Sequence, residues 1–316
     1  MILKMKVLVT GGVGFIGSWL VDKLVEKGNE VIVVDDLSIG KKENLINLEK
    51  VKFYLLDICE HEKLNEVFKK ERPEIIFHLA AQVMLRKSLE DPLYDARNNI
   101  IGTINVLEAC RKNNVKKIIY TSTGGARVGE PEYLPVDEKH PLKPLSPYGI
   151  SKHSAEHYVE AYSKLYNIDY LIFCFGNVYG PRDDPGTKRL IPLFIDLILK
   201  NKTPKIFGDG EQTRDFIYVL DLVDFMIESL DKIGSTEHKL FHLANGKQIS
   251  VNEVFKLLKE ISGFEREVEQ VEAIKGEVRD IVLDISLAER ELGWNPKTDI
   301  KKGLEGTLEW FKKYHS

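Results

Sequence analysis

Short apolar runs alternate with amphipathic stretches through about the first 170 residues, and this order limits the folds that the chain can adopt. Runs typical of strands lie at residues 7–9, 31–34, 53–56, 75–79, 117–122 and 170–174. Stretches with helical periodicity lie at residues 15–27, 62–70, 93–114 and 147–166. Strands that alternate with helices form βαβ units. The pattern therefore predicts an α/β fold built on a Rossmann-like, doubly wound parallel sheet.

A glycine-rich loop, TGGVGFIG at residues 10–17, joins the first predicted strand to the first predicted helix. Gly11, Gly14 and Gly17 recur at three-residue spacing, and their missing side chains would let a pyrophosphate approach the helix N-terminus. Glycine also serves ordinary turns, so the strand–loop–helix context carries the argument. Asp35 ends the next strand, where a carboxylate can bind the adenosine ribose or can simply stabilise a turn. The ribose role favours NAD over NADP, and NAD is the expected cofactor.

Tyr148 and Lys152 lie four residues apart in the last of these helical stretches, so their side chains share one face of the helix. A phenol with an ordinary pKa of about 10 is a poor base at neutral pH, and a neighbouring ammonium group stabilises its phenolate. The spacing alone is common on surface helices that have no catalytic role. Beside a dinucleotide site, a proton acceptor of this kind indicates oxidation of an alcohol.

The pattern changes after Gly176, where glycines and prolines interrupt the chain and the predicted elements become shorter. Helices are expected at residues 221–230, 251–262 and 304–314, and strands at 216–219 and 240–243. We expect residues 1–176 to form the dinucleotide-binding domain and residues 177–316 to form a smaller mixed α/β lobe. That lobe would cover the carboxyl edge of the sheet, with the chain crossing between the two parts.

Composition argues against several classes of partner. A net charge of -4 with scattered Lys and Arg is atypical of nucleic-acid binding. No run approaches ~18 consecutive apolar residues, so no membrane span is expected. Cys59, Cys110 and Cys174 lie far apart, and the histidines lack companions at metal-ligand spacing, so neither a disulfide framework nor a metal site is expected. The first strand begins almost at Met1, which leaves no room for a signal peptide and predicts a cytoplasmic protein.

End to end, the chain resembles the extended short-chain dehydrogenase/reductases (the NAD-dependent epimerase/dehydratase family), and within them the UDP-sugar 4-epimerases. Matching motifs follow in order: residues 10–17, Asp57-Ile58, His78-Leu79-Ala80-Ala81, Asn98-Asn99, Ser122-Thr123, and Tyr148 with Lys152. The resemblance implies a cofactor site made of Gly11, Gly14, Phe15, Ile16, Gly17, Asp35, Asp57, Ile58, Leu79, Ala80, Ala81, Asn99, Tyr148 and Lys152. It also implies that Tyr148 is the catalytic base and Lys152 its partner. The hydroxyl that holds the sugar oxygen would be Thr123, with Ser122 as the alternative.

The later motifs, GNVYGPR at residues 176–182 and GDGEQTRDF at 208–216, are similar to the substrate-binding segments of the family. The resemblance implies that Asn177 lies near the nucleotide diphosphate and that Arg214 and Arg279 hold the phosphates. Guanidinium groups suit this task because they match phosphate oxygens in two-point contacts. The family likeness further implies a homodimer whose four-helix bundle uses the helices at residues 93–114 and 146–166.

Two departures from the family pattern bear on the activity. Val128 stands where the family usually has tyrosine, and Arg127 before it has no family counterpart. Gly124 and Gly125 follow Thr123, at positions where the dehydratase and decarboxylase branches carry acidic residues. Without that acid, the resemblance favours a 4-epimerase that interconverts UDP-glucose and UDP-galactose through a transient 4-keto sugar.

Other substrates and one other class of function stay open at this stage. Arg189 could meet a carboxylate, which would make UDP-glucuronate the substrate. Ile281 is intermediate in size at a position that borders the sugar in the family, and it could admit UDP-N-acetylglucosamine. A non-catalytic NAD-binding protein is the alternative of a different class, since a fold does not fix a function.

Overall fold

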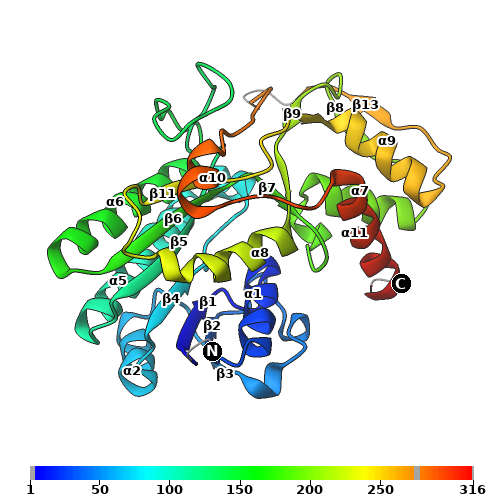
Figure 1. Ribbon diagram of the computed structural model, residues 1–316. Coiled ribbons are helices and arrows are strands. Elements are labelled where there is room, and N and C mark those ends of the chain that lie inside the picture. The colour runs from blue at the N-terminus through cyan, green and yellow to red at the C-terminus, as the bar shows by residue number, and fades with distance from the viewer. Residues whose placement is uncertain (1–3, 274–277, 315–316) are drawn as a thin grey trace.

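The centre of the protein is one parallel sheet, seen in a computed structural model that describes residues 4–273 and 278–314 (Figure 1). Its strand order is β11-β6-β5-β4-β1-β2-β3, and each pair of neighbours runs parallel. The strands are β1 (Lys6–Thr10), β2 (Glu30–Asp35), β3 (Lys52–Leu55), β4 (Ile75–His78), β5 (Lys117–Thr123), β6 (Asp169–Phe175) and β11 (Leu240–Leu243). The strand order reverses between β1 and β4, where doubly wound sheets open a crevice for ligands. The predicted fold class is confirmed.

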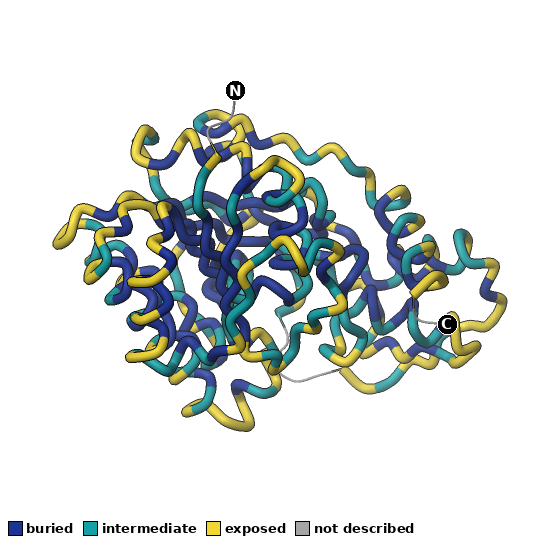
Figure 2. Tube along the Cα trace, turned by 90° about the horizontal axis from the view of Figure 1, so that it is seen from below, coloured by how far each residue is buried: buried dark blue, intermediate teal, exposed yellow. Residues whose placement is uncertain are grey.

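Helices cover both faces of this sheet, because alternate residues of each strand point to opposite sides. Val7 and Val9 of β1 pack in one apolar cluster with Leu20, and Leu8 between them packs in the other cluster with Leu64. The helices on the first face are α1 (Phe15–Glu26), α8 (Val219–Glu228) and α10 (Ser286–Leu292). Those on the second are α2 (His61–Glu71), α5 (Gly102–Lys112) and α6 (Pro147–Tyr166). Figure 2 shows that buried residues gather in the interior of the protein, with exposed residues mainly along its outside.

The helix expected at residues 93–114 is continuous but changes its winding. It follows α3 (Leu85–Glu90) and begins as α4 (Pro92–Ala96), where the Asp91 carboxylate accepts a hydrogen bond from the Tyr94 backbone N–H. A π-helical turn at Arg97–Ile101 then leads into α5. Such turns redirect side chains, and they are frequent near functional sites. Here the turn buries Asn99 against α6, 1% exposed.

A second lobe carries its own apolar core, lined by Phe194, Phe255 and Phe311 among others. Its helices are α7 (Leu190–Leu199), α9 (Val251–Ser262) and α11 (Ile300–Tyr314). Short strands pair beside them: β7 (Asn177–Tyr179) with β10 (Phe216–Tyr218), β8 (Lys205–Phe207) with β13 (Glu269–Val271), and β9 (Thr213–Arg214) with β12 (Ile249–Ser250). Figure 1 places this lobe beside the sheet, at the end where α7 and α11 meet.

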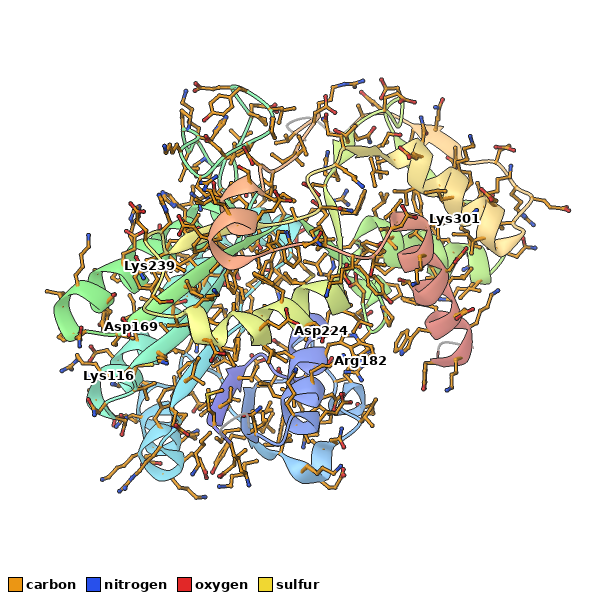
Figure 3. The ribbon with its side chains drawn as sticks, in the orientation of Figure 1. Lys116, Asp169, Arg182, Asp224, Lys239 and Lys301 are labelled. Carbon is orange, nitrogen blue, oxygen red and sulfur yellow. The ribbon has the colours of Figure 1, made fainter. Side chains whose placement is uncertain are left out.

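The chain crosses back to the sheet after entering the second lobe. Strand β11 pairs with β6, and α8 lies against α1 with an ion pair of 3.1 Å between Lys23 and Asp224 (Asp224 is labelled in Figure 3). Trp294 then packs on Phe225 and donates its ring N–H to the Ala244 carbonyl at 2.9 Å. Residues beyond 218 therefore complete the layer that residues 1–176 begin.

Within residues 4–273 and 278–314, no helix combines the length and apolar character that crossing a membrane requires.

Candidate active site

A cleft of about 1690 Å³ lies where the carboxyl ends of the sheet strands meet the second lobe. Many residues from both halves of the chain line it. Those that the sequence had singled out are Gly11, Gly14, Phe15, Ile16, Gly17, Asp35, Asp57, Ile58, Leu79, Ala80, Ala81, Ser122, Thr123, Tyr148, Lys152, Asn177, Arg189, Arg214 and Ile281. The structure therefore gathers nearly all of the candidate residues around one space.

The glycine loop forms one wall of the cleft and leaves the start of α1 open. Gly11 has a positive φ of 72°, which glycine adopts without strain. A Cβ atom at Gly17 would lie 2.1 Å from the Gly11 carbonyl oxygen, so the loop and the helix can approach this closely only without that side chain. Gly14 is the N-cap of α1, and no described side chain caps the helix there. The first amide groups of α1 are therefore suited to an anionic ligand.

Asp35 combines a structural role with a place in the cleft wall. Its carboxylate accepts hydrogen bonds from the backbone N–H groups of Val13, at 3.1 Å, and Leu37, at 2.9 Å. Burial raises the pKa of this carboxyl above its usual value. Each carboxylate oxygen can accept more than one hydrogen bond, so capacity for a ribose hydroxyl remains. Asp35 therefore stabilises a turn, which is one of the two roles considered from sequence, and its carboxylate can still bind a ligand.

Helix α6 brings Tyr148 and Lys152 into the cleft together. Ser146 caps the helix by accepting a hydrogen bond from the Gly149 N–H, and Pro147 occupies its first turn. A Cβ atom at Gly149 would lie 2.1 Å from the Ala126 carbonyl oxygen, so this glycine lets α6 approach the segment that follows β5. Thr123, the last residue of β5, lies close enough to Tyr148 for its hydroxyl to lower the pKa of the phenol. The three groups expected to be catalytic are thus neighbours.

The electrostatic setting of Tyr148 differs from the sequence expectation. Burial raises the pKa of Tyr148 to about 12, and the nearby positive charge of Arg189 and the hydroxyl of Thr123 oppose this rise. Burial also lowers the pKa of Lys152 to about 8, while the negative charge of Glu156 opposes the fall. The Lys152 ammonium group lies 4.3 Å from the centre of the Tyr120 ring. Arg189, which was not expected to act on the phenol, is therefore part of its environment.

A buried charged network lies behind Thr123 and occupies Ser122. The Ser122 hydroxyl donates to Glu156 at 2.5 Å, and Arg127 forms an ion pair with the same carboxylate at 3.3 Å. Arg127 also donates to the Cys174 sulfur at 3.0 Å, and His153 lies 2.9 Å from Glu156. Thr123 thus contacts Tyr148, whereas Ser122 is engaged on the other side of the strand. Glu156 was missed from sequence, although it follows Lys152 by one helical turn on the same face.

The segment from Pro181 to Arg189 closes over the glycine loop. The Arg182 guanidinium, labelled in Figure 3, stacks 3.7 Å from the Trp19 ring centre and donates to Asp22 at 2.8 Å. Trp19 in turn donates its ring N–H to the Pro181 carbonyl at 2.9 Å. Arg189 binds the buried Asp183 carboxylate and lies 5.1 Å from the Phe15 ring centre. Helix α1 therefore anchors this segment against the cleft.

Asn177, Arg214 and Arg279 differ in how they meet the cleft. Asn177 is exposed at the start of β7, and Arg214 lines the cleft while donating to the Arg279 backbone carbonyl at 3.0 Å. The Arg279 side chain, 60% exposed, pairs instead with Asp209 at 2.9 Å. It is not among the described residues that line the cleft.

Asn99 also lies behind the cleft wall and does not line it. Its side-chain amide donates to the Gln82 carbonyl at 3.0 Å and to the Ser151 hydroxyl at 3.0 Å, and its oxygen accepts from the Gln82 N–H at 2.8 Å. Gln82 follows Ala80 and Ala81, which do line the cleft. The structure therefore places Asn99 where it can position this loop.

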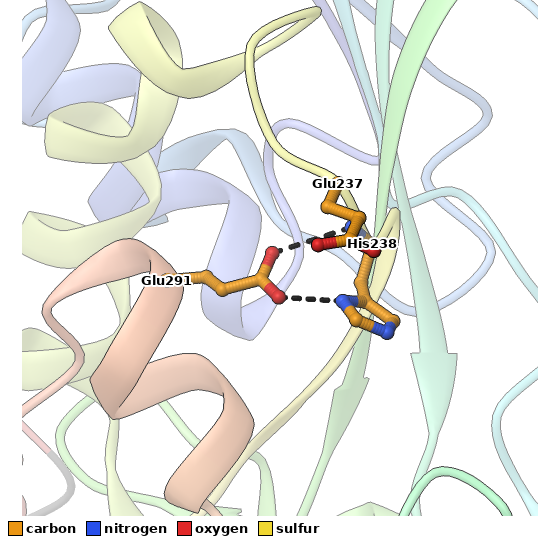
Figure 4. A group of neighbouring side chains, drawn as sticks. All are labelled: Glu237, His238 and Glu291. Carbon is orange, nitrogen blue, oxygen red and sulfur yellow. Dashed lines mark hydrogen bonds and ion pairs between the residues drawn. The ribbon is translucent and has the colours of Figure 1, made fainter.

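Glu237, His238 and Glu291 come close enough together to hold a metal ion (Figure 4). The three residues join the loop before β11 to α10, and Glu291 accepts hydrogen bonds from the backbone and ring of His238. Glu237 and His238 are exposed. Ion pairs of this kind are common on protein surfaces, and the group is not part of the cleft wall.

Comparisons with known proteins agree with this arrangement. Residues 8–307 match the family model described as GDP-mannose 4,6 dehydratase. A putative UDP-glucose 4-epimerase of Methanocaldococcus jannaschii is 46% identical over 307 residues, covering 97% of this chain and 98% of the relative. The structure of UDP-glucose 4-epimerase with UDP-glucose from Thermotoga maritima superposes with a TM-score of 0.94 at 42% identity, covering 99% of this chain and 100% of that one.

A further solved structure contains a dinucleotide. It is a UDP-glucose 4-epimerase of Thermus thermophilus in complex with NAD, similar with a TM-score of 0.91 at 34% identity and covering 98% of this chain and 100% of that one. Relatives between 32% and 35% identity include a UDP-glucuronate 4-epimerase, a UDP-N-acetylglucosamine 4-epimerase and a dTDP-D-glucose 4,6-dehydratase. Proteins as similar to the chain as these therefore act on different nucleotide sugars.

Proposed function

The chain belongs to the NAD-dependent epimerase/dehydratase family of extended short-chain dehydrogenase/reductases, and we propose that it inverts C4 of a UDP-hexose, interconverting UDP-glucose and UDP-galactose. The observation that carries this proposal is the meeting of Thr123, Tyr148 and Lys152 in a cleft that the glycine loop also lines. Enzymes of this family use NAD, and the residues that line the cleft suit this cofactor.

The residues present fit NAD. Gly14 and Gly17 leave the space and the open amide groups that a pyrophosphate needs at the start of α1. Asp35 would hold the adenosine ribose, and Asp57 with Ile58 would border the adenine. Leu79, Ala80 and Ala81 would flank the middle of the cofactor, while Tyr148 and Lys152 would face its nicotinamide end. Bound there, NAD supplies an acceptor and donor of hydride at the sugar C4.

The side chains supply the proton chemistry. Tyr148 takes the proton of the sugar 4-hydroxyl as C4 is oxidised, and returns it to the same oxygen when C4 is reduced from the opposite face. Thr123 holds that oxygen and the phenol in line. Lys152 and Arg189 supply positive charge near the phenol, which favours its ionised form. Both the hydride and the proton return to the sugar, so the reaction is an isomerisation with no net oxidation.

Retention of the keto sugar between the two steps requires binding at its nucleotide end. Asn177 and Arg214 line the cleft on the second lobe, where a diphosphate can reach both. Arg279 would join them by exchanging Asp209 for a phosphate, since this ion pair is exposed and weak. The sugar can then turn over without leaving.

Packing around Gly124 and Gly125 favours epimerisation over elimination. A Cβ atom at Gly124 would lie 2.3 Å from a Leu283 methyl carbon, and one at Gly125 would lie 3.3 Å from Ile281. An acidic side chain after Thr123, as in the dehydratase branch, therefore has no room at Gly124 without moving the core. Proton delivery to a departing 6-hydroxyl would lack the group that performs it in that branch.

We further propose that the protein is a homodimer. Large apolar side chains lie exposed along α4, the π turn and α6, including Leu93 at 82%, Ile101 at 48%, Tyr158 at 40% and Leu165 at 70%. Burying such a set against its copy would remove apolar surface from water, as a four-helix interface does. Sedimentation of the purified protein would measure the state directly.

The test is proton NMR of purified protein mixed in turn with UDP-glucose, UDP-N-acetylglucosamine and UDP-glucuronate, with no NAD added. We expect the epimer of UDP-glucose to appear with little or no accumulation of NADH. The Tyr148→Phe variant should lose at least about 10²-fold in kcat, the usual contribution of a positioned acid–base group, while NAD still co-purifies. Full activity of this variant, or absence of any epimer with all three sugars, would contradict the proposal.

A further inference from the structure

Three buried polar atoms without a partner gather in the segment that closes the cleft. Among the described residues, Arg182 Nη1, Asp183 Oδ2 and Arg189 Nε are buried and lack a hydrogen bond. All three residues line the cleft. A buried donor or acceptor that stays unpaired costs about 1–3 kcal/mol, so such atoms commonly mark a place where a ligand supplies the missing partner.

Asp183 and Arg189 form an incomplete pair. Asp183 is 1% exposed, and one of its oxygens binds Arg189 Nη2 while the other is unpaired within the described chain. Arg189 uses one arm of its guanidinium and leaves Nε unpaired. The two free positions are one acceptor and one donor. A hydroxyl group can satisfy both at once, because it donates one hydrogen bond and accepts others.

The pair lies at the reacting end of the cleft. Arg189 is close enough to Tyr148 for its charge to act on the phenol, and it stacks beside Phe15 of the glycine loop. A hexose whose C4 faces Tyr148 would bring its neighbouring substituents toward Asp183 and Arg189. In glucose these substituents are the hydroxyl on C3 and the hydroxymethyl group on C5, and a uronic acid has a carboxylate in place of the hydroxymethyl group.

We propose that Asp183 and Arg189 together bind a hydroxyl of the sugar and that Asp183 excludes a carboxylate from this position. This inference rests on the proposed function and names the class of sugar: a neutral hexose in preference to a uronic acid. A uronate would accept from Arg189, but it would also face the Asp183 carboxylate in a poorly hydrated site, where like charges repel strongly. Asp183 thereby cancels the charge that made Arg189 a candidate uronate ligand.

The segment is held firmly enough for this discrimination. Arg182 stacks on Trp19 and binds Asp22, and Lys41 forms an ion pair of 3.1 Å with Asp184 across the cleft. Asp183 lies between these two anchored residues. These contacts hold the backbone on both sides of Asp183 in place.

The experiment compares UDP-glucose with UDP-glucuronate on the wild type and on Asp183→Asn. Calorimetric Kd values and kcat/KM are measured for both sugars. The amide keeps the size of the side chain and removes its charge, so we expect the glucuronate-to-glucose preference to rise at least about tenfold, the scale set by one charged hydrogen bond. Asp224→Asn makes the same change of net charge outside the cleft, at the Lys23–Asp224 ion pair, and it should leave the preference unchanged.

Lowering the pH provides the same change in the unmodified protein. Burial raises the pKa of Asp183 to about 7, with Arg189 opposing this and Asp184 adding to it. Arg182 and Lys41 are the other charged groups beside this segment. Protonation of Asp183 below this pH removes its charge while the uronate stays ionised. The glucuronate preference of the wild type should therefore rise from pH 8 to pH 6, and that of Asp183→Asn should stay level.

The outcomes separate the two proposals. A wild type that binds both sugars but epimerises neither contradicts the proposed function, and the Kd ratios still test the role of Asp183. A preference that is the same in Asp183→Asn and the wild type, or a wild type that favours UDP-glucuronate at pH 8, overturns the role of Asp183. The pH series uses the wild type, so it tests the role of Asp183 even if Asp183→Asn misfolds.

Discussion

Removing Arg127 should destabilise the protein far more than removing an exposed arginine. Arg127 and Glu156 have side chains that are only 4% and 2% exposed, and their charges lie 3.3 Å apart. Arg127→Met keeps a chain of similar length but leaves the buried Glu156 carboxylate with uncharged or weakly donating partners, namely Ser122, Cys174 and His153. Breaking a buried pair in this way costs about 3–5 kcal/mol, since the remaining charge has lost its compensation.

The intact Arg127–Glu156 pair should contribute much less to the free energy of unfolding than the cost of breaking it. Arg127 Nε has no hydrogen-bond partner within the described residues, so part of the desolvation penalty of the guanidinium is not recovered. Replacing both residues by methionine removes both charges, and such replacements of buried pairs are often neutral or stabilising by about 1–4 kcal/mol. The double variant should therefore be more stable than Arg127→Met alone.

Urea unfolding at one fixed NAD concentration measures these differences, since a bound ligand also shifts stability. Circular dichroism and tryptophan fluorescence should give coincident transitions before free energies are compared. Arg111→Met is the matched control, because the Arg111–Glu108 pair on α5 is 37% and 20% exposed and should contribute less than about 1 kcal/mol. A cost below about 1 kcal/mol for Arg127→Met, or a double variant that loses the sum of both single costs, would refute the reasoning.

Two further predictions concern the cleft. Gly17→Ala would place a methyl group 2.1 Å from the Gly11 carbonyl oxygen, so we expect the purified variant to lose co-purifying NAD and at least about 1–3 kcal/mol of stability, measured by absorbance and urea unfolding. Lys152→Met should stabilise the protein at pH 7 while abolishing turnover. Burial lowers the folded pKa of Lys152 from 10.5 to about 8. Below pH 8, keeping the buried side chain charged therefore lowers the free energy of unfolding by roughly 3 kcal/mol. This cost becomes smaller as the pH rises from 8 to 10.5, because in this range the unfolded chain still holds a proton that the folded protein has released. Calorimetry at pH 7 and pH 10 should show a smaller gain at pH 10, and an equal gain at both would contradict this origin.

Local pattern was enough to predict the first half of the fold. The strand runs at residues 31–34 and 117–122 fall inside β2 and β5, and the helix expected at residues 147–166 is α6 itself. These elements can be predicted from the sequence because apolar periodicity and capping residues act within a few positions of one another. Helix α7 was not predicted, although its buried residues recur on one face, because its sequence LIPLFIDLIL is apolar at nearly every position and contains a proline.

Tertiary relations were harder to foresee. The strand at residues 240–243 was expected in the second lobe, yet it pairs with β6 in the main sheet, and a local pattern cannot name a partner strand. In the site, the loop and the Tyr148–Lys152 pair follow from spacing, because each is short-range. Glu156, Asp183 and Arg127 gain their meaning only from burial against distant segments, which spacing does not encode. A charge four residues after Lys152 was the one signal that could have drawn attention to Glu156.

The crossing of the chain between the lobes also dictates when the protein can be completed during its synthesis. Strand β6 has an open hydrogen-bonding edge until Leu243 has left the ribosome, and α1 lacks its cover until α8 has followed. The apolar contacts of Trp294 come later still. When only the first 176 residues have been made, the sheet therefore still lacks strand β11, and α1 still lacks α8. A fragment ending there should aggregate, and the region before residue 177 should fold stably only when residues 219–294 are also present.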